Sequence, residues 1–196
     1  METALQQEPS DCLRIVLFGP ESTGKTTLAK ALADHFNDPW VPEYMRDYAQ
    51  EKWDASGQTL EREDLLPIAK GQMEVENRCV AKCKSFLFCD TNLLEIKVYS
   101  EYYFNGFCPE LLAKYAEENT YDLYFLTDVD VPWVKDDLRD RPNDRFTLFH
   151  IFETELKKLK LPYVTLSGSH EFRFQKALQA LEKLASNVHR KGPTTN

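Results

Sequence analysis

The sequence predicts an α/β fold, a three-layer αβα sandwich built on a five-stranded parallel sheet. Two observations lead to this prediction. Short, continuous apolar runs recur along the chain, and stretches with helical periodicity separate them. A continuous apolar run suits a strand that is covered on both faces, as in a parallel sheet. Helices between such strands supply the crossover connections that parallel strands require.

Five segments are the predicted strands. Four are apolar runs closed by small or polar residues, namely Leu13–Phe18, Phe86–Cys89, Leu123–Leu126 and Tyr163–Leu166. The fifth, Trp40–Pro42, is flanked and closed by proline, which confines it to a sheet edge or a strand end.

Helices are predicted where apolar side chains recur every three or four residues. The second of these helices tolerates Pro67 in its first turn, and Ser169 is a residue type favoured at the N-cap of the last one. The apolar stripes comprise Leu28, Leu32 and Phe36; Ile68, Gln72, Met73, Val75 and Val80; Phe149, Phe152, Leu156 and Leu159; and Phe174, Ala177, Leu178, Leu181, Leu184 and Val188.

The length and polarity of the chain predict one domain. A chain of 196 residues is long enough for one sizeable core, which we place at 12–187. The polar ends, 1–11 and 188–196, are expected to be disordered.

The composition restricts the partners and the compartment. A formal net charge of −8 argues against non-specific binding to nucleic acid, which needs a basic field. No apolar stretch approaches the roughly 18 to 20 residues that span a bilayer, and the N-terminus lacks the features of a secretory signal. The number of cysteines is odd, and Cys12 and Cys89 lie in or beside apolar runs where a free thiol packs as a small hydrophobic group. A reducing cytoplasm is the predicted location.

The stretch GPESTGKT, at residues 19–26, carries the strongest functional signal. It fits the phosphate-binding pattern G-x-x-x-x-G-K-[ST], with a predicted strand before it and an amphipathic helix after it. The glycines permit a backbone in which successive N–H groups face an anion. Lys25 supplies a charge for the β and γ phosphates, and Thr26 offers a hydroxyl to Mg²⁺. An accidental loop match is the alternative. The predicted ATP-binding residues here are Gly19, Glu21, Ser22, Thr23, Gly24, Lys25, Thr26 and Thr27.

Asp90 is the predicted second partner of Mg²⁺. It follows the apolar run Phe86–Cys89, at the end of a strand where ligands of parallel sheets bind. The alternative is that Asp90 only caps the next helix, a role that Thr91 or Asn92 could also take.

Three arginines within seven residues, Arg139, Arg141 and Arg145, lie in a segment of about 130–146 that we interpret as a mobile lid. Guanidinium groups match phosphate oxygens and can neutralise charge during phosphoryl transfer. Arg139 is the first choice for this catalytic role. A solvated face in which these arginines pair with neighbouring aspartates is the alternative.

The segment PEYMRD, after the predicted edge strand, is the candidate for binding a phosphate acceptor. Glu43 could accept the proton of an attacking hydroxyl, while Tyr44 and Arg46 could hold the acceptor or its flat ring. By spacing alone, a charged helix start explains the segment equally well.

Taken together and in order, these stretches resemble the ribosylnicotinamide kinase domain of the NadR type, within the P-loop nucleotide kinases. The matching stretches are LFGPESTGKT, PEYMRDYA, Lys70-Gly71-Gln72, FCDTN, DVPWVKDDLRDR and LPYVTLSGSHEFRF. They run from about Arg14 to Leu184.

The resemblance implies transfer of the ATP γ-phosphoryl group to the 5′-hydroxyl of nicotinamide riboside, with Mg²⁺, on a sheet of order 2-3-1-4-5. It places Glu43, Tyr44, Arg46, Gln72 and Asn92 on the riboside side. Asp90 would lie between metal and acceptor, Arg139 would come from the lid, and the turn at Gly168 would cover the adenine.

The chain departs from the family pattern at Pro42, where relatives tend to carry an aromatic residue, and at Asp137, where glycine is expected. Only about a dozen residues precede the first strand, so the DNA-binding and adenylyltransferase parts of bifunctional relatives are not expected. A kinase of another nucleoside-like alcohol and a nucleotide-dependent switch remain as alternatives. The expected partners are small molecules, with monomer and homo-oligomer both left open.

Overall fold

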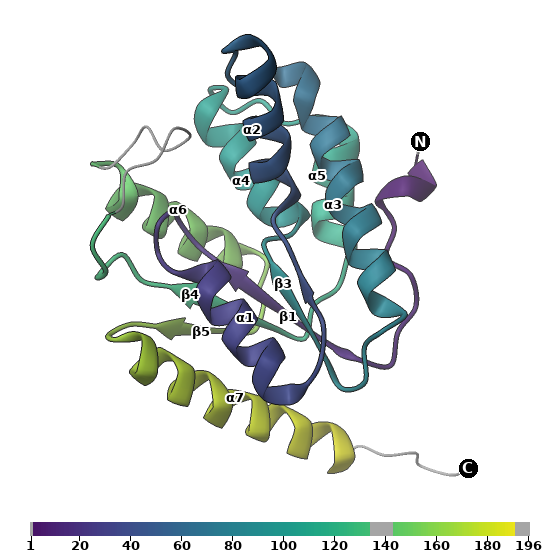
Figure 1. The fold of residues 1–196 in the computed structure, drawn as a ribbon, viewed down its shortest axis with the longest axis vertical. Helices are drawn as coiled ribbons and strands as arrows, with labels where there is room; N and C mark the ends of the chain where they lie inside the picture. The colour runs from purple at the N-terminus through teal and green to yellow at the C-terminus, as the bar shows by residue number, and fades with distance from the viewer. Residues whose placement is uncertain (1, 134–142, 191–196) are drawn as a thin grey trace.

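The computed structural model describes residues 2–133 and 143–190, and its centre is a five-stranded sheet (Figure 1). All four pairings between neighbouring strands are parallel, in the order β2-β3-β1-β4-β5. The predicted fold class and strand order are therefore confirmed. The strands are β1 (Leu13–Phe18), β2 (Trp40–Val41), β3 (Phe86–Asp90), β4 (Leu123–Thr127) and β5 (Tyr163–Leu166).

Helices cover both faces of the sheet, which completes the three layers (Figure 1). One face carries α1 and α7, and the other carries α3, α4, α5 and α6. The helices are α1 (Lys25–Phe36), α2 (Tyr44–Ser56), α3 (Leu65–Val80), α4 (Leu93–Tyr103), α5 (Glu110–Glu118), α6 (Arg145–Lys158) and α7 (His170–Arg190), with short 3₁₀ helices η1 (Glu2–Leu5) and η2 (Arg62–Asp64).

The continuous apolar sequence of β1 follows from its central position in the sheet. Successive side chains of a strand point to opposite faces. Ile15 and Leu17 pack into the core beneath α1 and α7, whereas Val16 and Phe18 pack into the core on the opposite face. None of these four side chains is exposed, so every position from 15 to 18 must be apolar.

The helices α2 and α4 carry no single apolar stripe, and the periodicity of the sequence did not predict them. All eight residues from Leu93 to Ser100 in α4 are buried, so there is no polar face to contrast with an apolar one. The helix α2 has the opposite composition, because none of its residues is buried. Tertiary packing, and not amphipathicity, decides where these two helices lie.

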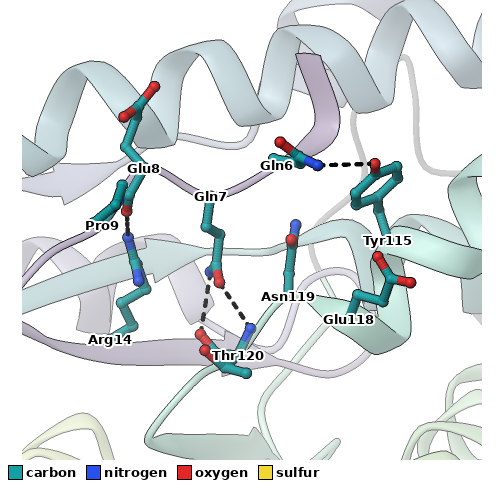
Figure 2. Close-up of a pocket in the computed structure, with 9 residues that line it drawn as sticks. All are labelled: Gln6, Gln7, Glu8, Pro9, Arg14, Tyr115, Glu118, Asn119 and Thr120. Carbon is teal, nitrogen blue, oxygen red and sulfur yellow. Dashed lines mark hydrogen bonds between the residues drawn. The ribbon is translucent and has the colours of Figure 1, made fainter. Parts of the chain in front are cut away.

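The N-terminal segment is packed against the domain, in contrast to the expectation of a disordered tail over 1–11 (Figure 2). Leu5 is 2% exposed and joins the core beneath α3 and α5. Gln6 donates a hydrogen bond to the Tyr115 hydroxyl, and Gln7 donates to Glu76 and to the Thr120 carbonyl. The segment borders a polar cavity of about 380 Å³. Its polar side chains therefore find partners on the domain instead of in water.

The helix α7 continues to Arg190, three residues beyond the predicted end of the domain. Ser169 caps it as predicted, since its Oγ accepts the Phe172 N–H at 3.2 Å. Residues 191–196 lie outside the described part of the chain. No helix in the described ranges has the length and hydropathy to cross a bilayer.

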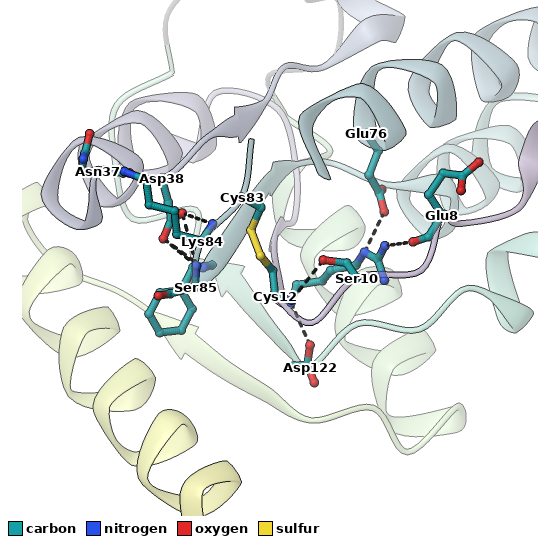
Figure 3. The surroundings of a disulfide bond; sticks show 12 residues. Glu8, Ser10, Cys12, Asn37, Asp38, Glu76, Cys83, Lys84, Ser85 and Asp122 are labelled. Carbon is teal, nitrogen blue, oxygen red and sulfur yellow. Dashed lines mark hydrogen bonds and ion pairs between the residues drawn. A yellow bond between two sulfur atoms is a disulfide. The ribbon is translucent and has the colours of Figure 1, made fainter. Parts of the chain in front are cut away.

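One cysteine that was expected to be free, Cys12, forms a disulfide. Cys12, just before β1, forms a disulfide with Cys83, in the connection between α3 and β3 (Figure 3). Their Cα atoms lie 6.3 Å apart although the residues are 71 positions apart in the sequence. The interpretation of Cys12 as a packed free thiol is therefore wrong. The parallel pairing of β1 with β3 places the first residues of the two strands side by side, which brings Cys12 close to Cys83. The reducing cytoplasm stays a prediction.

Candidate active site at the end of strand β1

The loop after β1 has the backbone that the motif predicts. Gly19 has a φ of +133°, and a Cβ there would lie 2.9 Å from the Thr127 Oγ1, so only glycine fits. Gly24 has a φ of +86° and is the N-cap of α1, which begins at Lys25. Because glycine has no side chain to cap the helix, the first N–H groups of α1 face the loop. The helix dipole adds positive potential at the same place.

The ammonium group of Lys25 is held inside this loop. Its Nζ donates to the carbonyls of Gly19, at 2.6 Å, and Pro20, at 3.1 Å. It also forms an ion pair with Glu95 on α4, at 3.1 Å. Burial opposes the charge of Lys25, but the carboxylates of Glu95, Glu43 and Asp90 outweigh that effect and raise the pKa of Lys25 above its ordinary value. Lys25 therefore keeps its charge.

Thr26 and Asp90, the two residues predicted to bind Mg²⁺, lie in contact. The Thr26 hydroxyl donates to the Asp90 Oδ2 at 2.5 Å, which joins the start of α1 to the end of β3. The other carboxylate oxygen, Oδ1, is buried and has no hydrogen-bond partner among the residues that the structure describes. Burial raises the pKa of Asp90, against the effect of nearby Lys25. A hydroxyl and a buried carboxylate oxygen beside a phosphate-binding loop fit Mg²⁺. Asn92, and not Asp90, caps α4, by accepting the Glu95 N–H at 3.1 Å.

A cavity of about 710 Å³ extends from the loop into a cleft between α2 and α4. One end is polar and includes the loop from Glu21 to Thr27 together with Glu43 and Arg46. The other end is mainly aromatic and apolar, and its polar residues are Gln58, Thr59 and Ser100. The side chains at this second end include Met45, Trp53, Leu60, Leu65, Ile96, Tyr99, Tyr103 and Phe104.

The predicted acceptor residues divide into two groups. Glu43 and Arg46 line the cavity, as the interpretation of PEYMRD requires. Tyr44, Gln72 and Asn92 are not among the lining residues. The Gln72 side chain accepts the Tyr44 N–H at 2.8 Å and donates to the Pro42 carbonyl at 3.2 Å. Asn92 donates to the Tyr124 hydroxyl at 3.1 Å. In the structure these three residues hold the start of α2 and the start of α4 in place.

The Tyr44 ring of α2 packs directly against Gly71 of α3, because a Cβ at position 71 would lie 2.0 Å from that ring. We expect Gly71→Ala to displace this ring and with it the start of α2, destabilising the protein by about 1 to 3 kcal/mol. Thermal unfolding measures the change. The double variant with Tyr44→Ala should be less destabilised than the sum of the two single variants, since the clash is gone. Additive effects would contradict this account.

Arg173, near the start of α7, joins three segments of the backbone, one of which is the phosphate-binding loop. It donates to the carbonyls of Thr23 at 2.6 Å, Gly168 at 3.0 Å and Asp128 at 3.0 Å, and it forms an ion pair with Asp130. The guanidinium thus ties the phosphate-binding loop to the end of β4 and to the turn before α7. That turn contains Gly168, the residue that the resemblance places over adenine, with a φ of +91°.

The arginines of the predicted lid are only partly described. Arg139 and Arg141 lie at 134–142, outside the described residues. Arg145 begins α6 and donates to the carbonyls of Val131, at 3.0 Å, and Ser22, at 3.1 Å. Arg145 therefore supports the backbone of the phosphate-binding loop.

Sequence reasoning missed three features of this site. Glu95 and Arg173 are buried and contact the loop, but they lie in helices whose sequences contain other charged residues. The aromatic end of the cavity combines Trp53 from α2 with Tyr99 and Tyr103 from α4, which are distant in sequence. The motif FCDTN stops three residues before Glu95 and contains no signal for it.

Comparison with known proteins assigns the chain to a family. The AAA_28 family model, described as an AAA domain, matches residues 14–173, which span the loop, Asp90 and Arg173. The chain belongs to the AAA_28 family. The described phosphate-binding loop is thus the P-loop of an AAA_28 domain.

The curated relatives of this AAA_28 chain support the resemblance drawn from its motifs. It is 26% identical over 173 residues to the trifunctional NAD biosynthesis/regulator protein NadR of Salmonella typhimurium, covering 87% of this chain and 42% of that protein. The corresponding protein of Escherichia coli is 25% identical over the same lengths. The chain spans less than half the length of these curated relatives. The resemblance to NadR is confirmed.

Solved structures confirm the fold of the AAA_28 chain. A NadR protein in complex with NR has a TM-score of 0.72 at 23% identity, with 88% of this chain and 51% of that chain covered. The thymidylate kinase of Ehrlichia chaffeensis has a TM-score of 0.63 at 16% identity, with 89% and 100% covered. The shared architecture is that of P-loop kinases.

Proposed function

We propose that this chain is an ATP-dependent kinase that transfers the γ-phosphoryl group to the 5′-hydroxyl of nicotinamide riboside, giving nicotinamide mononucleotide. One observation carries the proposal: a single cavity joins the phosphate-binding loop to a cleft lined by aromatic rings. Such a cavity holds a phosphoryl donor and a flat acceptor end to end, which in-line transfer requires. The names of the curated relatives, which refer to NAD biosynthesis, support the choice of acceptor.

Four side chains at or beside the polar end have a role in this proposal. Lys25 neutralises charge on the transferring phosphoryl group once it has left its internal partners. Thr26 and Asp90 hold magnesium, which neutralises further phosphate charge when it is bound. Glu43 faces the acceptor cleft and orients or deprotonates the hydroxyl. The contact of Asp90 with Thr26 favours the metal role for Asp90 and leaves the acceptor side to Glu43.

The donor nucleoside belongs on the opposite side of the loop. The γ-phosphate must point toward the cleft between α2 and α4, so the rest of ATP extends toward the starts of α6 and α7. The turn at Gly168 lies there and covers the adenine in this proposal, while Arg139 of the lid completes the charge neutralisation.

A substrate panel tests the proposal. The protein is incubated with Mg·ATP and one acceptor at a time, namely nicotinamide riboside, adenosine, thymidine or gluconate, and ADP release is measured together with the phosphorylated product. We expect nicotinamide riboside to give the highest kcat/KM. Trp53→Ala should raise its KM by about tenfold, because a stacking ring contributes about 1 to 1.5 kcal/mol. Phe172→Ala removes an exposed ring that lies outside the described cavity, beside the Gly168 turn on the proposed donor side, and is the matched control for the KM of nicotinamide riboside.

The other outcomes of the panel separate the alternatives. Faster turnover of another nucleoside would assign the aromatic cleft to that base and reject nicotinamide riboside. Slow ATP hydrolysis that no acceptor accelerates would indicate a nucleotide-dependent switch.

A further inference from the structure

The side chain of Glu95, from α4, is buried against the phosphate-binding loop. It is not part of the loop motif and has no role in the proposed transfer. Its side chain is fully buried and lies between two groups that serve phosphate binding. One carboxylate oxygen pairs with the Lys25 ammonium at 3.1 Å, and the other accepts the Gly19 N–H at 3.3 Å. A carboxylate thus makes the two kinds of contact that a phosphate would make in this loop.

A bound polyphosphate and an ionised Glu95 compete for the same partners. If Lys25 turns toward the phosphates, the Glu95 carboxylate loses its counter-ion while it stays buried. An unpaired buried carboxylate is costly, and a polyanion next to it adds like-charge repulsion. Uptake of a proton removes both penalties at once.

We propose that Glu95 is a positioning residue whose ionised form holds Lys25 as its internal counter-ion in the free protein, and that a bound polyphosphate takes over Lys25 while an ionised Glu95 takes up one proton from solvent. No covalent bond other than the new O–H bond forms. This inference rests on the proposed binding of a nucleotide at the loop.

The surroundings of Glu95 set the pH at which this coupling acts. Burial raises the pKa of Glu95 to about 8, although Lys25 opposes the shift. The other groups that face it are Glu43 at the start of α2, Asp90 at the end of β3 and the Tyr99 hydroxyl on α4 itself. Burial holds the pKa of Tyr99 well above its ordinary value, and the pKa of Lys25 is raised, so neither group titrates near pH 8.

The affinity for a nucleotide should decrease with rising pH only above about pH 8. Below pH 8, Glu95 of the free protein already carries its proton, and binding takes up little. Above pH 8, the free protein has an ionised Glu95, and the complex has a protonated one. The affinity for a nucleotide should then fall by about tenfold per pH unit, with close to one proton taken up per nucleotide bound.

Isothermal titration with Mg·ADP, in buffers of different ionisation enthalpy, measures this proton uptake. We expect a small uptake at about pH 7 and close to one proton at about pH 9 for the unmodified protein. Glu95→Gln keeps the shape and removes the charge, so its uptake should vanish and its Kd at about pH 9 should be about tenfold lower than that of the parent. Glu155→Gln is the matched control, because Glu155 also pairs with a buried lysine, Lys97, but lies away from the loop.

The possible outcomes distinguish failure of the role proposed for Glu95 from failure of the proposed kinase function. Binding of Mg·ADP to the unmodified protein without proton uptake at about pH 9 overturns the role of Glu95, whatever the variants do. Uptake that persists in Glu95→Gln also overturns it, because another group then takes the proton. Absence of any binding at either pH contradicts the nucleotide site itself, and with it the proposed kinase.

Discussion

Lys25→Ala is expected to lower the kcat for phosphoryl transfer by about 10²- to 10³-fold or more, because removing one preorganised charge from a dry site has this effect on an ionic transition state. Lys25 is the cation of the loop and is almost fully buried. Alanine at this position leaves the backbone N–H groups in place. Nucleotide binding should therefore weaken less than turnover. Single-turnover measurement of product formation separates the two effects.

The fold should survive this substitution. Glu95 loses its partner, but its pKa is already raised to about 8, so at neutral pH it carries a proton and leaves no unpaired buried charge. Lys183→Ala, which removes an exposed lysine of α7, is the control and should leave kcat unchanged. Far-UV circular dichroism checks the fold of both variants. If Lys25→Ala turned over at the rate of the parent protein, the loop would not be the site of phosphoryl transfer.

Arg173→Ala is expected to destabilise the protein by about 3 kcal/mol. The change leaves three backbone carbonyls, those of Thr23, Asp128 and Gly168, without the donor that satisfies them. Each buried acceptor left without a donor costs about 1 to 3 kcal/mol, less where water reaches it. Asp130 is one-third exposed, so the loss of its ion pair adds less. For a chain of this size, about 3 kcal/mol corresponds to a fall in Tm of about 6 to 12 °C.

The effect of Arg173 should depend on the shape of its side chain. Arg173→Lys keeps the charge but cannot supply the same fork of donors, so it should recover only part of the lost stability. Lys183→Ala, on an exposed part of the same helix, is expected to change the stability by less than about 0.5 kcal/mol. Urea denaturation measures all three variants. Equal stability of Arg173→Ala and the control would contradict this role.

Much of the fold was predictable because the strands lie in the middle of the molecule. Burial on both faces forces continuous apolar sequences, as in β1 and β3, and these are visible without a structure. The helices α2 and α4 could not be predicted from apolar periodicity. Most of α4 is buried and no residue of α2 is, so neither helix has one apolar and one polar face. The position of the N-terminal segment also could not be predicted. Its glutamines are typical of a disordered tail, and their hydrogen-bond partners, Tyr115 and Thr120, lie more than 100 residues away in the sequence.

The sequence by itself determined the phosphate-binding loop, the position of Asp90 at the end of β3 and the five strands of the sheet. These features depend on residues close together in the chain, whose backbone and burial requirements restrict the residue types. Only the tertiary structure decided that Glu95 pairs with Lys25, that Arg173 holds the loop from its other side, and that Trp53 and Tyr99 share a cavity. These partners come from different helices, and a charge or a ring on a helix has the same local pattern whether it faces water or a site.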